Sequence, residues 1–170
     1  MRELFSIDLK DYPENSSVFR RPSARAIILK NGKISLVYST AEKYYKFPGG
    51  GIHNDEDKET ALIREVKEET GLIVIPETIR EFGSVLRRQK GKYPDEIFEQ
   101  ENFYYTCDVY DEVSSQNLDD YEKEAGFELR VVNIDEAIST NAAYDTEDSF
   151  NKIMIKREHR VLNLIKQELM

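Results

Sequence analysis

The stretch of residues 47–74, FPGGGIHNDEDKETALIREVKEETGLIV, constrains the fold of this chain more than any other part of its sequence. It begins with an extended run that a proline and three glycines stop, because both residue types interrupt regular structure. Asn54 or Asp55 can cap a helix whose acidic first turn suits the positive end of the helix dipole. Gly71 supplies the residue that follows a helix C-terminus, so we predict that the helix ends just before it.

The expected helix carries three glutamates on one face. At about 100° per residue, Glu69 lies near +40° and Glu68 near −60° from Glu65, so the three carboxylates share an arc of about 100°. Leu62 and Val66 fall beside this arc, which places the carboxylates at the edge of the core. Like charges three or four residues apart destabilise a helix by roughly a few tenths of a kcal/mol per pair. A divalent cation would remove this repulsion, and an all-oxygen set of ligands favours Mg²⁺ or Mn²⁺ over zinc.

Gly49, Gly50 and Gly51 precede this helix and let the backbone turn sharply and approach a ligand closely. Their peptide groups can present a carbonyl to a metal or amides to a phosphate oxygen. A glycine-rich loop alone is a weak signal. Next to three carboxylates on one helix, it indicates a combined site for a cation and a phosphorylated ligand.

Composition excludes several classes of protein. The net charge of −9 argues against broad binding to a nucleic-acid backbone, so we expect no DNA partner. The single cysteine, Cys107, excludes an internal disulfide and fits a reducing compartment. No apolar run approaches the length of a membrane span, and the first residues lack the apolar stretch of a signal peptide. We therefore expect a cytoplasmic protein without a membrane partner.

The rest of the chain alternates between extended and helical patterns. We predict a short strand over residues 3–9, a polar connector over residues 13–22, and a hairpin with its turn at Asn31-Gly32. Further extended segments are expected at YYKFPGGG, LIVIP, EFGSVLRRQ, IFEQENFYYTCDVY and GFELRVVNI, and a short helix at IDEAI. The tail from about Thr146 to Leu169 has the apolar spacing of an amphipathic helix.

No repeat and no linker divides the chain, so we predict a single domain over residues 1–170. Within it, residues 1–22 form an N-terminal strand and connector, and residues 146–170 a C-terminal helix. The mixture of strands with a few helices predicts an α/β sandwich.

Gly50, Glu56 and the run REVKEETGL at residues 64–72 together resemble the complete Nudix box of the Nudix hydrolases. At average residue usage a chance match is on the order of one in 10⁹ per start, and the glutamate-rich composition loosens this by a factor of about ten to a hundred. The flanking strand order over residues 23–138 is also similar to that of the family. Asp55 stands where many members have glycine, a departure that affects the turn of the loop and not the ligands.

The resemblance implies an α/β/α sandwich with a central mixed sheet. It also implies hydrolysis of a nucleoside diphosphate linked to another group, a small-molecule nucleotide substrate, with Mg²⁺ or Mn²⁺ as cofactor. Carried over by position, the metal ligands would be Glu65, Glu68, Glu69 and the carbonyl of Gly49, and Arg64 would hold a carboxylate in position for catalysis. Glu56 would steady the junction of loop and helix or join the outer shell of the metal.

A general base is the least defined part of this expectation. In relatives this acid often lies on a loop just before a late strand, which here is LDDYEKEAG before FELRVV. We expect Glu124, the acid closest to the strand, over Glu122, with a metal-bound group as the alternative. Both glutamates are equally compatible with solvated loop charges.

Three other functions remain open. A prenyl diphosphate isomerase shares this fold but needs a reactive cysteine, whereas Cys107 lies in a strand pattern typical of core residues. A non-catalytic nucleotide-sensing Nudix domain usually loses box carboxylates, and this chain keeps them all. An RNA 5′-end pyrophosphohydrolase is disfavoured by the acidic balance, although Arg20, Arg21, Arg87 and Arg88 could line a local path.

The sequence restricts the substrate only by exclusion. The proline and tyrosine that accompany ADP-ribose and dinucleoside polyphosphate specificity are missing from the positions past the box, where Arg87 and Arg88 stand as candidate substrate-binding residues with Gly49, Gly50 and Gly51. We therefore favour a nucleoside triphosphate or an oxidised nucleotide. Aromatic residues 103–105 could stack a base, although alternate members are expected in the core. A homodimer is also left open.

Overall fold

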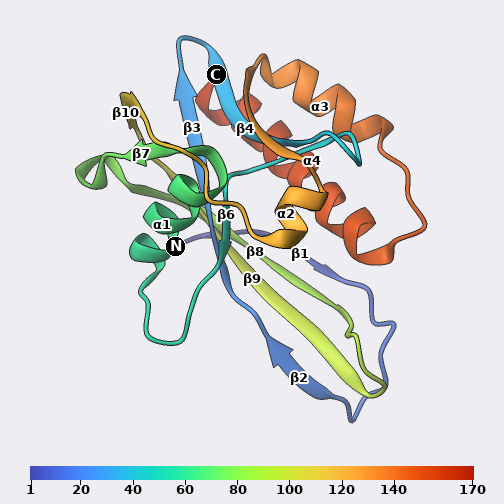
Figure 1. Ribbon diagram of the computed structural model, residues 1–170. Helices are drawn as coiled ribbons and strands as arrows, with labels where there is room; N and C mark the ends of the chain where they lie inside the picture. Colours follow the sequence, from blue (N-terminus) through green and yellow to red (C-terminus); the bar gives the residue numbers. More distant parts are fainter.

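The computed structural model describes all residues 1–170. It contains eleven strands, four α-helices and one short 3₁₀ turn (Figure 1). In chain order these are β1 (Glu3–Asp8), β2 (Ser17–Arg20), β3 (Ser23–Lys30), β4 (Lys33–Ser39), β5 (Tyr44–Lys46), β6 (Gly49–Gly51), α1 (Lys58–Thr70), β7 (Leu72–Val74), the 3₁₀ turn (Pro76–Thr78), β8 (Arg80–Lys90), β9 (Glu96–Thr106), β10 (Val109–Val113), α2 (Asp120–Glu124), β11 (Phe127–Val132), α3 (Ile134–Ala143) and α4 (Ser149–Leu169).

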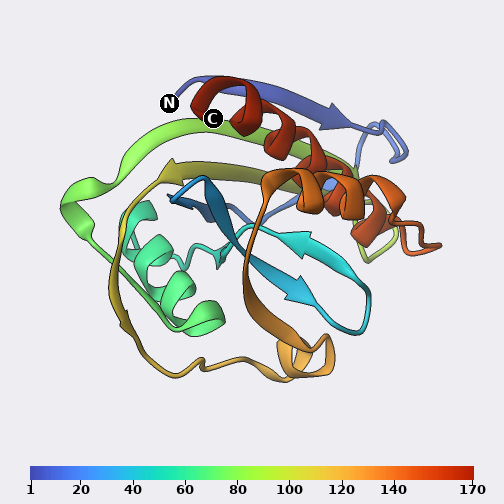
Figure 2. The same cartoon turned by 90° about the horizontal axis from the view of Figure 1, so that it is seen from above.

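The strands build a central mixed sheet with helices on both of its faces. The main order is β1-β8-β9-β3-β4-β11, in which β1–β8 and β3–β9 are parallel pairs and the other pairs are antiparallel. Figure 2 shows α3 and α4 on one side of the strands and α1 on the other. This arrangement confirms the predicted α/β/α sandwich. No helix is both long enough and apolar enough to span a membrane.

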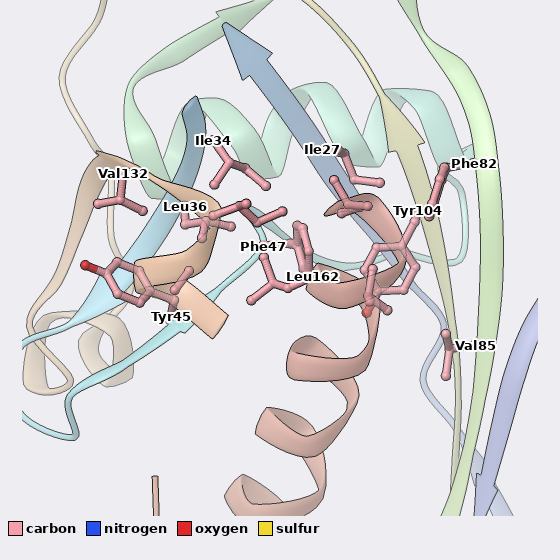
Figure 3. Close-up of a cluster of buried hydrophobic side chains, with 14 residues drawn as sticks. Ile27, Ile34, Leu36, Tyr45, Phe47, Phe82, Val85, Tyr104, Val132 and Leu162 are labelled. Carbon is pink, nitrogen blue, oxygen red and sulfur yellow. The ribbon is translucent and has the colours of Figure 1, made fainter. Parts of the chain in front are cut away.

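The alternation of residues along β3 divides the core into two layers. Ala24, Ala26 and Ile28 face α1 and pack with its buried side chains, among them Leu62. Ile27 faces the opposite way, into a cluster that includes residues of α4 (Figure 3). Each face of the sheet is thus covered by one helical layer, which is the geometry that a period of two along a strand dictates.

Strand β3 changes its partner along its length, and this change positions the site. Its first three residues, Ser23–Arg25, pair with the glycines of β6, whereas Ile28–Lys30 pair with the start of β4. Strands β4 and β6 are therefore separate partners of β3, and a gap in the sheet lies between them. The glycine strand β6 lines this gap, where side chains from both faces of the sheet can meet.

Several predicted boundaries are confirmed. Asn31 and Gly32 form the hairpin turn, and both have the positive φ that such a turn requires (53° and 71°). Gly71 has a φ of 75° immediately after α1, and its N–H donates to the carbonyl of Lys67. The amphipathic tail forms α4, which begins at Ser149.

Other predicted boundaries are wrong. Helix α1 is capped by Asp57, whose carboxylate accepts from the N–H of Thr60 at 2.8 Å, and not by Asn54 or Asp55. The connector at residues 13–22 contains β2, which pairs with the first residues of β9. This strand depends on a partner about 80 positions away, which the local sequence does not reveal. The expected loop LDDYEKEAG contains α2, started by a capping box between Asp119 and Glu122.

Candidate functional site

A cavity of about 370 Å³ opens beside the glycine strand β6, near α1, α2 and the start of α4. Its lining combines both charges with aromatic rings. The cationic residues are Arg21, Arg25, Lys46 and Arg87, the acidic ones Glu65, Glu69, Asp119 and Glu122, and the aromatic ones Phe98, Tyr121, Phe127 and Phe150, with Gly49, Gly50 and Gly51 completing one wall. We call this space the site cavity. A larger, shallower hollow of about 790 Å³ beside the first turn of α1 contains none of the three glutamates of the acidic arc.

The acidic arc of α1 is divided between two cationic side chains. Glu69 is buried and pairs with Lys46 at 2.5 Å, and its second oxygen accepts from the N–H of Gly49 at 2.9 Å. Glu65 and Glu68 both accept from Nη1 of Arg64, at 2.7 and 3.1 Å. The repulsion inferred from the sequence is thus offset in this structure by Lys46 and Arg64.

Arg64 is the centre of this arrangement. It forms two 2.8 Å bonds to Glu56, one from Nε and one from Nη2, and Nη2 also donates to the carbonyl of Gly51 at 3.1 Å. The hydrogen bonds from Arg64 lower the pKa of Glu56 to about 2. One guanidinium therefore links the glycine strand, the loop before α1 and two glutamates of the arc.

The glycines are required by close approach on both sides. A Cβ at Gly49, whose φ is 137°, would lie 2.1 Å from the carbonyl oxygen of Ala24. A Cβ at Gly50 would lie 2.2 Å from Oε2 of Glu65, so this carboxylate occupies the space that a side chain would fill. The carbonyl of Gly49 accepts a hydrogen bond from Nη1 of Arg25. A carbonyl oxygen has two lone pairs, so this bond leaves one for another partner.

The residues of the arc fit a hard divalent cation by their chemistry, because carboxylate and carbonyl oxygens are the ligands that such ions prefer. Burial raises the pKa of Glu65, and the nearby charge of Glu69 raises it further. An additional cation would therefore stabilise the ionised form of Glu65. No group of three or more acidic, histidine or cysteine side chains is arranged to hold a metal here. The physical reason is that Arg64 and Lys46 draw the carboxylates in different directions. Metal binding would require exchange of these partners.

The structure places Glu122, and not Glu124, on the site cavity. Both residues lie in α2, where positions two apart point to nearly opposite sides of the helix. Glu122 lines the cavity and is half-buried, whereas Glu124 is exposed and outside the lining. Burial raises the pKa of Glu122 to about 7, with a contribution from the charge of Glu69. The preference for Glu124 rested on an extended loop that is in fact a helix.

Arg87 and Arg88 are also separated, because successive residues of a strand face opposite sides of the sheet. Arg87 is buried in the site cavity, where Nη2 donates to the carbonyl of Phe150 at 2.9 Å. Burial, together with the charge of Arg157, lowers the pKa of Arg87 because both disfavour its charged form. An anion beside Arg87 would stabilise this charged form and would itself be stabilised. Arg88 points away from the cavity, toward Asp8 and Glu99. Only the first of the two can contact a ligand in the site cavity.

The sequence did not reveal the importance of Arg25. Its side chain is only 7% exposed and lines the cavity, and its Nε has no hydrogen-bond partner. Buried donors without partners are rare and costly. The signal in the sequence was an arginine between two alanines, next to the apolar run of the same strand.

A second missed feature is the adjacent pair Arg157 and Glu158 of α4, both fully buried. Glu158 accepts from the N–H of Phe47 at 2.7 Å and from the hydroxyl of Tyr104 at 3.0 Å. Arg157 donates to Glu158 and to the side chains of Gln100 and Asn102. This network fixes the backbone two residues before the glycines from behind the sheet.

Cys107 and the aromatic run at residues 103–105 are core residues, as the sequence indicated. Burial raises the pKa of Cys107 to about 12, which removes the thiolate that a cysteine-dependent isomerase would need. Phe103 and Tyr105 pack on the α1 side of the sheet and Tyr104 on the other. None of the three lines the site cavity.

Comparisons with known proteins bear on the family and the fold of the chain. A family profile described as NUDIX domain matches residues 19–155. An RNA pyrophosphohydrolase from Marinomonas sp. (strain MWYL1) is 44% identical over 54 residues, which is 31% of this chain and 33% of that protein. The chain thus matches about a third of the length of this relative.

One solved structure shows the same fold. A NUDIX hydrolase from Nitrosomonas europaea superposes with a TM-score of 0.54 at 20% identity, covering 82% of this chain and 89% of that one. A MutT structure from a study of Aliivibrio salmonicida and Vibrio cholerae gives a TM-score of 0.48 at 18% identity, covering 84% and 99%. At these identities the first of them supports the fold alone.

Proposed function

Because this chain belongs to the Nudix hydrolase family, we propose that it hydrolyses a phosphoanhydride bond of a nucleoside diphosphate linked to another group, with Mg²⁺ or Mn²⁺ as cofactor. The observation that carries this proposal is the site cavity, where glutamates of the arc, the glycine strand and four cationic side chains line one space. A polyphosphate is strongly anionic, and its cleavage requires positive groups already oriented toward the charge that develops.

Glu65, Glu68 and Glu69, with the carbonyl of Gly49, would hold the metal. When bound, a divalent ion neutralises phosphate charge and makes a water molecule more acidic. Arg64 already holds two of these glutamates and the carbonyl of Gly51. It would therefore orient the carboxylates as a positioning residue.

The cationic side chains would bind the phosphate oxygens. Arg25 has a buried Nε without an acceptor, and a phosphate oxygen supplies one. Arg87 of β8 and Arg21, in the link between β2 and β3, line the same cavity, and Lys46 lies beside Glu69. The guanidinium groups suit this task because their planar array of donors matches the geometry of a phosphate.

Glu122 replaces Glu124 as our candidate for the general base. Its Oε2 accepts from the N–H of Asp119 at 2.8 Å, which leaves Oε1 to accept a proton from the attacking water. A carboxyl group whose pKa is near the working pH is well suited to this transfer. Asp119 would act as a positioning residue through its backbone.

The identity of the substrate is the finer part of the proposal. A nucleoside triphosphate or an oxidised nucleotide fits the exclusions made from the sequence. A second candidate is the 5′ end of an RNA, favoured by the 44% identity to an RNA pyrophosphohydrolase over 54 residues. The two share a nucleotide with a 5′ polyphosphate, and under this proposal the site cavity would bind that common group.

The test is a screen of nucleoside triphosphates, oxidised nucleotides, nucleoside diphosphate conjugates and a 5′-triphosphorylated oligonucleotide with Mg²⁺ or Mn²⁺. Released phosphate and pyrophosphate are measured for the triphosphates, and nucleoside monophosphate for the conjugates, with Glu68→Gln as the control. We expect at least one substrate to be cleaved by the wild type only. Binding of nucleotides without any cleavage would contradict the proposal and favour the nucleotide-sensing alternative.

The cytoplasmic location and the homodimer remain predictions, and sedimentation would test the second.

A further inference from the structure

A second cavity, of about 350 Å³, lies between β2, the tip of the β8–β9 hairpin and the first turn of α4. Its lining consists of four aromatic residues, two cationic residues and one acid: Phe19, Tyr93, Phe98 and Phe150, Arg21 and Lys92, and Glu96. We call it the hairpin pocket. In Figure 1 the hairpin projects beyond the helices, with β2 alongside it.

The hairpin pocket adjoins the site cavity. Arg21, Phe98 and Phe150 line both spaces. Arg87 marks the boundary between them, because its guanidinium lies 5.3 Å from the ring centre of Phe98 and 5.2 Å from that of Phe150. A ligand with one end in each space would therefore lie against these side chains.

The two spaces differ in chemistry. The site cavity is lined by four cationic and four acidic residues, which suits a metal and a chain of phosphates. In the hairpin pocket the aromatic residues outnumber the charged ones, and its outer rings are uncovered, with Phe19 50% and Tyr93 62% exposed. Flat rings that are open to solvent favour stacking of another planar ring, and this stacking is tolerant of base identity.

The cations complete the match. Arg21 lies at the junction of the two spaces, and Lys92 is on the outer wall of the hairpin pocket. A ligand with a planar ring at one end and an anionic chain at the other would place its ring between Phe19 and Tyr93 and its charge at Arg21. Nucleotides are ligands of this kind.

We infer that the hairpin pocket binds the base and sugar of the nucleotide substrate while the polyphosphate lies in the site cavity. This inference rests on the proposed function. It names Phe19 and Tyr93 as residues that bind the base, although they lie on β2 and in the hairpin turn, outside the Nudix box. The pocket would contribute affinity through the base, and the chemistry would remain with the site cavity.

Titration calorimetry with non-cleavable ligands tests the inference separately from catalysis. The probes are methylene-bridged analogues of ATP, GTP, CTP and UTP, compared with methylene diphosphonate, which has no base. The proteins are the wild type, Phe19→Ala/Tyr93→Ala and the control Tyr110→Ala, in which an equally exposed aromatic residue of β10 is removed. Circular dichroism verifies that each variant is folded.

We expect the wild type to bind at least one nucleotide analogue on the order of 10-fold or more tighter than the diphosphonate. The double variant should lose most of this preference and bind the diphosphonate unchanged, and Tyr110→Ala should behave like the wild type. With a cleaved substrate, the double variant should raise KM by a similar factor at nearly constant kcat.

The outcomes separate the two proposals. Nucleotide binding that depends on Phe19 and Tyr93, without cleavage of any substrate, would support the hairpin pocket and contradict only the proposed function. Cleavage and binding that are unchanged in the double variant would overturn the hairpin pocket alone. A double variant that shifts only the sedimentation of the protein, with no effect on binding, would show an interface between copies and would also overturn it.

Discussion

Arg64 and Arg157 are both arginines that organise carboxylates near the glycine strand, but their surroundings differ. Arg64 is partly exposed and is shared among Glu56, Glu65, Glu68 and a backbone carbonyl, and the side chain of Glu68 is 37% exposed. Arg157 and its partner Glu158 are fully buried, and every acceptor around them is supplied by the protein. One network is accessible to an incoming ion, and the other is closed.

This difference shows which charged side chains can exchange their hydrogen-bond partners. Water or a cation can replace a hydrogen bond of the Arg64 network, because solvent reaches it. Nothing can replace a bond of the Arg157 network, and a buried charge that loses its partner is strongly destabilising. We therefore assign ligand binding and catalysis to the first network and support of the glycine strand to the second.

The largest expected effect comes from Glu68→Gln, in the Arg64 network. Turnover should fall by orders of magnitude because a metal ligand is lost, while the melting temperature should change little because the side chain is partly exposed. Steady-state kinetics and calorimetry measure the two effects. Glu59→Gln, an exposed acid in the first turn of the same helix, is the control. Near wild-type turnover in Glu68→Gln with every candidate substrate would refute the assignment.

Glu122 should give the next effect, one that depends on pH. Burial raises its pKa to about 7, so its ionised form, the only one that can accept a proton, disappears as the pH falls below this value. We expect kcat to decrease below about pH 7, and Glu122→Gln to lower kcat by on the order of 10²–10⁴ and to remove this limb. Both are read from pH–rate profiles at saturating metal.

Glu124→Gln is the matched control for this experiment, since Glu124 lies on the same short helix but outside the site cavity. Its profile should follow that of the wild type. Equal and small losses in both variants would mean that neither residue is the base.

Glu158→Gln tests the Arg157 network through the stability of the folded protein. Removal of one charge from a fully buried pair should lower the free energy of unfolding by about 3–5 kcal/mol, because Arg157 would remain buried without a counter-charge. Denaturant unfolding measures this change. Glu168→Gln, near the exposed end of the same helix, should stay within about 1 kcal/mol of the wild type, because its ion pair with Arg2 lies at the surface. A comparably small loss in Glu158→Gln would remove the distinction between the two networks.

The smallest expected effect is the change in melting temperature when a metal binds at the Arg64 network. A cation that binds only the folded state at about 100 times its Kd stabilises it by about 2.7 kcal/mol, so Mg²⁺ or Mn²⁺ should raise the melting temperature by several degrees. Glu65→Gln/Glu69→Gln should reduce the shift between metal-free and metal-loaded protein. A wild-type melting curve that is independent of metal would argue against a cation site.

Local sequence signals predicted the frame of the site well. Glycine spacing, the helical arc and the end of the helix at Gly71 depend on residues within a few turns of one another, and the structure has these elements where the sequence indicates them. The capping box at Asp119 and Glu122 was also readable, and recognising it would have turned the expected loop into a helix. That step alone would have favoured Glu122 over Glu124.

The rest of the site depends on distant pairings. Glu158 reaches the N–H of Phe47 across 111 positions, and β2 exists because it pairs with the start of β9. In the sequence Arg157 and Glu158 are two charges in an amphipathic helix, which predicts exposure and not burial. The separation of Arg87 from Arg88 likewise required the orientation of β8 in the sheet.

The length of the β8–β9 hairpin has an evolutionary consequence. Strands β8 and β9 each have eleven residues, Tyr93 lies in the turn that joins them, and the tip of this hairpin projects beyond the helices (Figure 1). Removing two residues from each strand would shorten the hairpin by roughly 7 Å without altering a residue of the box. Insertions and deletions at a surface tip are well tolerated. A lineage could thus acquire a new substrate by changing the reach of this hairpin, while the catalytic apparatus is inherited intact.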